Sequence, residues 1–112
     1  MQTKKYILIV LFLVSGLYAN TFDIAYIKES GQDMIIIPMN SNFMSKDHKT
    51  QQMIYTDLEV CAHAAHLKGN VMVVAEQSGR FSFYGPKQWE SFFKDLNMNW
   101  VKARINKKLA CH

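Results

Sequence analysis

The sequence predicts an α+β fold, a two-layer sandwich in which two helices pack on one face of an antiparallel sheet. Three observations predict this class. Short apolar runs with strand-like alternation or β-branched residues recur along the chain, one long segment has apolar residues at helical spacing, and a second such segment follows Gly85 and Pro86. The predicted order of elements is β-β-α-β-β-α-β.

The first 19 residues have the layout of a secretory signal peptide. Lys4 and Lys5 precede an apolar run over 6–14, and the small residue Ala19 follows shortly after. This run is too short to span a bilayer as a stable helix, which needs about 20 residues. We expect cleavage after Ala19 and a periplasmic or secreted protein without a transmembrane segment. An uncleaved membrane anchor is the alternative.

Cleavage would leave one small domain, residues 20–112. Removing 19 of the 112 residues leaves 93, the size of a single domain with a modest core. Without Lys4 and Lys5, the 13 basic residues fall to 11 against 9 acidic ones, a net charge of +2. So small an excess does not predict nucleic-acid binding.

The mature chain should begin with a β-hairpin and continue into a long helix. Residues 21–28 alternate, 29–33 form a turn, and the β-branched run 34–37 ends at Pro38. A helix is predicted from about 47 to 68, with Asp47 as its cap and Gly69 after its end. Its apolar stripe consists of Ile54, Leu58, Cys61, Ala62 and Ala65.

A second hairpin and a second helix should follow. Residues 70–76 have the composition of a buried strand, 77–80 form a turn, and 81–84 alternate again. Pro86 suits the first position of a helix. The apolar face of that helix would consist of Trp89, Phe92, Phe93 and Leu96.

The last segment, 99–111, fits two patterns. Alternate positions carry the apolar residues Val101, Ala103 and Ile105, and later Leu109 and Cys111, which predicts a strand. Helical spacing from Met98 onward, together with favourable helix propensities, is the alternative. We predict the strand.

Cys61 and Cys111 are predicted to form a disulfide bond. Two cysteines in one small exported domain usually pair. Cys61 lies on the apolar stripe of the long helix and Cys111 on the apolar side of the last predicted strand, so both should reach the same interface. Free thiols and an intermolecular bridge are the alternatives.

The polar side of the long helix carries a weak candidate metal site. Glu59, His63 and His66 are spaced at i, i+4 and i+7 and could approach one ion, although zinc needs three or four converging ligands. The alternative is a solvated helix face with ordinary surface histidines. We expect no metal and no cofactor.

Aromatic and basic residues in the C-terminal half form the candidate ligand-binding surface. Its aromatic members are Tyr84, Trp89 and Trp100, and its basic members are Lys102, Arg104 and Lys108. Amphipathic aromatics can line a ligand cleft, and a basic stripe can contact an acidic partner. The alternatives are a core role for the aromatics and a charged, solvated strand edge.

No motif in the sequence indicates catalysis. The chain has no Gly-rich phosphate loop, no Gly-x-Ser-x-Gly and no Cys-x-x-Cys. We therefore expect a non-catalytic binding or accessory module that recognises another exported protein or a component of the cell envelope. A metal-dependent protein that uses Glu59, His63 and His66, and a secreted inhibitor or toxin-like protein, are the alternatives.

Overall fold

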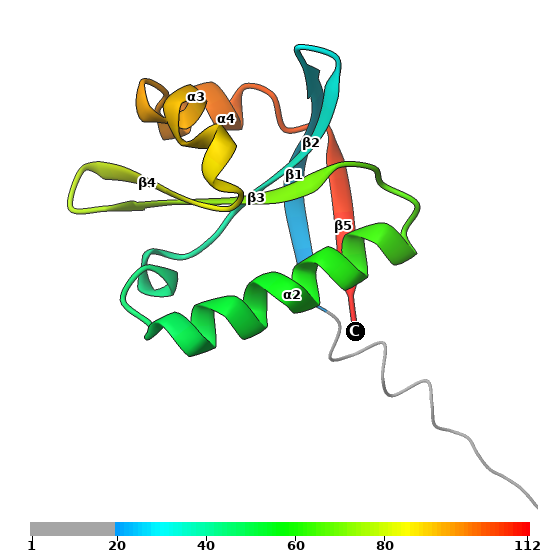
Figure 1. The fold of residues 1–112 in the computed structure, drawn as a ribbon, viewed down its shortest axis with the longest axis horizontal. Helices are drawn as coiled ribbons and strands as arrows, with labels where there is room; N and C mark the ends of the chain where they lie inside the picture. The colour runs from blue at the N-terminus through cyan, green and yellow to red at the C-terminus, as the bar shows by residue number, and fades with distance from the viewer. Residues whose placement is uncertain (1–19) are drawn as a thin grey trace, which may run out of the picture.

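The computed structural model describes residues 20–112, which form one five-stranded sheet flanked by helices (Figure 1). The strands are β1 (Asn20–Glu29), β2 (Gln32–Pro38), β3 (Asn70–Gln77), β4 (Arg80–Tyr84) and β5 (Lys107–Cys111). The helices are α2 (His48–Ala64), α3 (Glu90–Lys94) and α4 (Met98–Lys102), with short 3₁₀ turns η2 (Ser41–Phe43) and η3 (Lys87–Trp89). The predicted α+β class is confirmed. The predicted signal peptide lies outside the described residues.

Both predicted hairpins are present, and each closes through a Ser-Gly pair. Ser30 and Gly31 have φ values of 51° and 77°, and Ser78 and Gly79 have values of 52° and 76°. Positive φ at both central residues defines the two-residue turn whose twist matches that of paired strands. The turns therefore fix the registers of β1 with β2 and of β3 with β4.

The sheet is mixed and not fully antiparallel as predicted. Its strand order is β4-β3-β2-β1-β5, and β2 pairs with β3 in parallel while the other three pairs are antiparallel. Parallel neighbours require a long crossover connection. The helix α2 connects β2 to β3 and provides that crossover, which allows the parallel pair.

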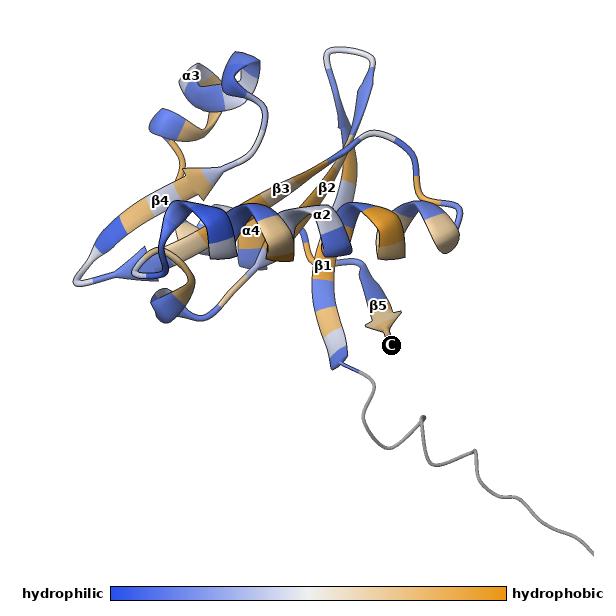
Figure 2. Ribbon diagram, turned by 60° about the horizontal axis from the view of Figure 1, so that its bottom comes forward, coloured by the Kyte–Doolittle hydropathy of each residue, from blue (hydrophilic) through white to orange (hydrophobic). Residues whose placement is uncertain are grey.

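The helices cover both faces of the sheet, whereas the sequence pattern predicted them on one. Leu58 and Ala62 of α2 pack with Ile35 and Ile37, while Phe93 and Val101 belong to a second core that includes the intervening Ile36. The connection from β4 to β5 must run from one edge of the sheet to the other. Since α2 already covers one face, α3 and α4 cross the opposite one (Figure 1). Hydrophobic stretches along β1, β2 and β3 lie between these layers (Figure 2).

The helix α2 begins as predicted and ends earlier. Asp47 accepts a hydrogen bond from Thr50 N at 2.9 Å, which confirms its capping role, and hydrogen bonding to Thr50 lowers the pKa of its carboxyl group. The helix stops at Ala64, because His66 adopts a left-handed φ of 68° before the chain reaches Gly69. Gly69 therefore shapes the connection to β3 and does not end the helix directly.

The C-terminal segment combines both alternatives. Its first part forms α4, and its last five residues form β5 against β1. Between them, the Asn106 side chain accepts a hydrogen bond from Tyr26 N at 2.8 Å and donates one to Tyr26 O at 2.9 Å. This side chain extends the hydrogen bonding between β1 and the C-terminal segment to a position just before the start of β5.

The predicted disulfide between Cys61 and Cys111 is present. The two Cα atoms are 5.7 Å apart, within the range that disulfides adopt. The bond joins the last residue of β5 to the C-terminal half of α2. It therefore ties the edge of the sheet to the helix that covers it.

Candidate functional site

The carboxylate of Glu59 serves the fold and not a metal ion. Its Oε2 atom accepts hydrogen bonds from Val71 N at 2.7 Å and from the Tyr55 hydroxyl at 3.1 Å. These contacts attach α2 to the start of β3. The Glu59 carboxylate therefore links α2 to β3. Its position on the polar side of the helix did not predict this structural role.

The two histidines near the end of α2 do not complete a metal site with Glu59. His63 Nε2 donates a hydrogen bond to Gly69 O at 2.8 Å, and His66 lies past the helix end, where the backbone turns left-handed. Within residues 20–112, no three His, Cys, Asp or Glu side chains are grouped so that they could hold a metal ion. The helical spacing that predicted convergence does not extend to His66.

The aromatic and basic candidates lie in three separate places. Tyr84 packs against Phe43 and Tyr55 on the α2 side of the sheet. Trp89 is buried in the other core, and the partly buried Trp100 packs against that core. These aromatics therefore do not form one surface.

The basic residues are also divided. The Arg104 guanidinium stacks 3.9 Å from the centre of the Trp100 ring and donates to Trp100 O at 3.0 Å, with Lys102 exposed nearby on α4. Lys108 forms an ion pair with Asp23 at 2.7 Å on the edge strand. Only Trp100, Lys102 and Arg104 lie on the same segment.

The described domain has an apolar groove beside α2, which we call the α2 groove. It has a volume of about 740 Å³, within the size range of small-ligand sites. Its sheet side is formed by the N-terminal end of β1 and the C-terminal end of β5. These two strand ends pair with each other and lie beside α2 (Figure 1). Its apolar lining includes Phe22, Met39, Ile54, Leu58, Val60, Ala64, Ala110 and the disulfide, and its polar members are Asn20, Asp57 and His112.

Small residues leave space for the α2 groove, and an exposed valine makes its surface more apolar. Ala64, Ala65 and Ala110 fill little space, so the helix and the strand ends leave a hollow between them. The Val60 side chain lines this groove and is 65% exposed. The sequence pattern did not predict this site, because its parts come from both ends of the domain. The available signal was Val60, an apolar residue outside the stripe of the helix.

No protein-family model matches the chain, and neither a curated protein nor a solved structure matches it. The function must therefore be inferred from the geometry of the α2 groove. Within residues 20–112, no helix has the length and apolar character of a membrane span.

The hydroxyl of Tyr55, a residue of α2, should make the stability of the fold sensitive to alkaline pH. Burial, followed by the nearby charge of Glu59, raises the pKa of Tyr55 above its ordinary value of 10.0. Because the pKa of Tyr55 is higher in the folded state than in the unfolded state, the protonated hydroxyl contributes its full stabilisation below the unfolded-state pKa of about 10. This contribution is lost as the pH rises above that unfolded-state pKa. Urea unfolding at about pH 9 and pH 11 should therefore show a larger loss for the parent than for Tyr55→Phe. Equal losses would contradict the assignment.

Proposed function

We propose that this protein is an exported, non-catalytic binding module that holds an apolar part of an envelope component or of another exported protein in the α2 groove. The observation that carries the proposal is an apolar hollow with an exposed Val60 at its rim. Contiguous apolar surface that is hollowed and open to solvent is typical of interaction sites. The groove also lies over the disulfide, which holds both of its walls in place.

The export part of the proposal rests on the N-terminal sequence and is supported by the disulfide. Disulfides persist mainly in oxidising compartments. Intact mass of the protein recovered from the cell envelope or medium should correspond to a chain that begins within two residues of Asn20. A mass that retains Lys4 and Lys5 would contradict export with cleavage.

The non-catalytic part is supported by how the polar side chains are used. Glu59 bonds to Val71 of β3, and His63 bonds to Gly69 in the connection before that strand. None of the buried residues in the described domain is polar or charged. A turnover that is abolished by changing Glu59, His63 or His66, in a variant that still folds, would contradict this part.

An apolar fluorescent dye, 8-anilinonaphthalene-1-sulfonate, tests the groove itself. The folded domain should bind the dye saturably, and Val60→Glu should weaken binding roughly tenfold or more, since about 1.4 kcal/mol of lost contact has that effect. Met53→Glu is the matched control, because Met53 is also on α2, is 59% exposed and does not line the groove. Equal weakening by both variants would show that the dye binds elsewhere.

A further inference from the structure

We propose that two copies of this chain associate through antiparallel pairing of their α2 helices, centred on Met53. The surface involved is the row Lys49, Met53 and Asp57, which we call the α2 ridge. This inference goes beyond the proposed function, because it concerns the outer face of α2 and not the binding of a ligand in the groove.

The α2 ridge exposes an apolar side chain in a polar setting. Only two large apolar side chains in the described domain are strongly exposed, Met53 at 59% and Val60 at 65%, and both are on α2. Val60 belongs to the α2 groove, whereas Met53 borders a smaller hollow of about 390 Å³. That hollow is lined by Lys49, Gln52, Met53, Thr56 and Asp57. Met53 therefore marks a second surface on the same helix, and Asp57 lies at the border between this surface and the α2 groove.

The three residues of the α2 ridge are spaced by four, so they lie in one row along the helix. Rows with this spacing are the ridges through which helices pack against one another. Lys49 and Asp57 are about 12 Å apart along the axis at 1.5 Å per residue, too far to pair within one copy. Neither forms an ion pair within the described residues.

The charges of the ridge complement themselves only in one orientation. In an antiparallel pair with its two-fold axis at Met53, each Lys49 faces Asp57 of the other copy, and the two methionines meet in the middle. A parallel pair would place Lys49 against Lys49 and Asp57 against Asp57. Charge complementarity therefore selects the antiparallel, two-fold symmetric arrangement. The same arrangement removes Met53 from water.

Charge reversal gives a test that needs no ligand. Sedimentation equilibrium of residues 20–112, up to about 1 mM so that even a weak dimer is populated, should show a dimer. Lys49→Glu alone places a glutamate opposite Asp57, and Asp57→Lys alone places a second lysine opposite Lys49, so each variant should be monomeric. An equimolar mixture of the two variants should dimerise again, because both facing pairs are then of opposite charge.

Several results would overturn the proposal. A parent protein that stays monomeric throughout the concentration series would contradict the proposed dimer. A mixture of the two variants that fails to dimerise, although both variants fold, would also contradict it. Dimers that survive both single changes would place the interface elsewhere. Lys94→Glu, an equal charge change on exposed α3, is the control and should leave the dimer unchanged. Dye binding in the α2 groove is measured separately, so failure of the dimer and failure of the groove are distinguishable.

Discussion

Cys111→Ser is expected to lower the free energy of unfolding by about 2–5 kcal/mol. The disulfide closes a loop with a sequence separation of 50, for which chain entropy alone gives about 4 kcal/mol. It also attaches an edge strand of only five residues to α2. In a domain of this size, each kcal/mol lost from the free energy of unfolding lowers the melting temperature by about 4–8 °C. The melting temperature of Cys111→Ser should therefore fall by at least about 8 °C.

Reduction provides the control for this prediction. A thiol reductant should lower the melting temperature of the parent by a similar amount and leave Cys111→Ser unchanged, because the variant has no bond to break. Thiol titration of unreduced, denatured protein should detect no free thiol. A variant that melts at the temperature of the parent would show that the bond contributes nothing to the fold.

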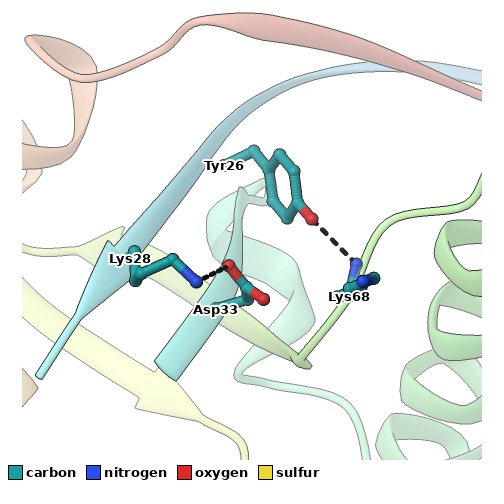
Figure 3. Close-up of polar contacts among 4 residues, drawn as sticks. All are labelled: Tyr26, Lys28, Asp33 and Lys68. Atoms are coloured by element: carbon teal, nitrogen blue, oxygen red, sulfur yellow. Dashed lines mark hydrogen bonds and ion pairs between the residues drawn. The ribbon is translucent and has the colours of Figure 1, made fainter. Parts of the chain in front are cut away.

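Gly69→Ala should be the second strongly destabilising change. Gly69 has a φ of 93°, and a Cβ atom there would overlap the carbonyl oxygen of Asp33. The neighbouring Lys68 N donates to the Tyr26 hydroxyl at 2.9 Å, and Asp33 pairs with Lys28 at 3.1 Å (Figure 3). The connection from α2 to β3 is thus held on β1 by Lys68, and at Gly69 it lies directly against the backbone of Asp33 on β2. We expect a loss of roughly 3 kcal/mol or more from strain and overlap together.

Gly79→Ala is the matched control for Gly69→Ala. Gly79 has a similar φ of 76°, but a Cβ atom there would meet nothing within 4 Å. Only the left-handed backbone penalty remains, which is about 1–2 kcal/mol. Urea unfolding of both variants separates conformational strain from steric overlap. Equal losses would show that the close approach to Asp33 does not matter.

Local patterns in the sequence predicted most of the elements and the disulfide. The Ser-Gly turns, the Asp47 cap and the apolar stripe of α2 are local signals, and each is present in the structure. Ala65 is the exception within the stripe, because it lies past the end of α2 and is exposed. The parallel pairing of β2 with β3 and the placement of α3 and α4 depend on which strands become neighbours. A pattern confined to one segment carries no information about its neighbours in the sheet.

The candidate sites were harder to predict for the same reason. Glu59 and His63 looked free on the helix surface, yet their partners Val71 and Gly69 come from the next connection and strand. The α2 groove joins Asn20 to His112 across almost the whole described chain. Such a site exists only after β1 and β5 pair, so composition and spacing could not reveal it.

The central claim is that the α2 groove is the binding surface, and amide chemical-shift mapping tests it most directly. Isotope-labelled protein comprising residues 20–112 would be titrated with 8-anilinonaphthalene-1-sulfonate. The claim predicts saturable shifts at Val60, Ala64 and Ala110, which line the groove, and none at Trp100 on the opposite face. Shifts centred on Trp100, or no saturable shifts at all, would contradict it.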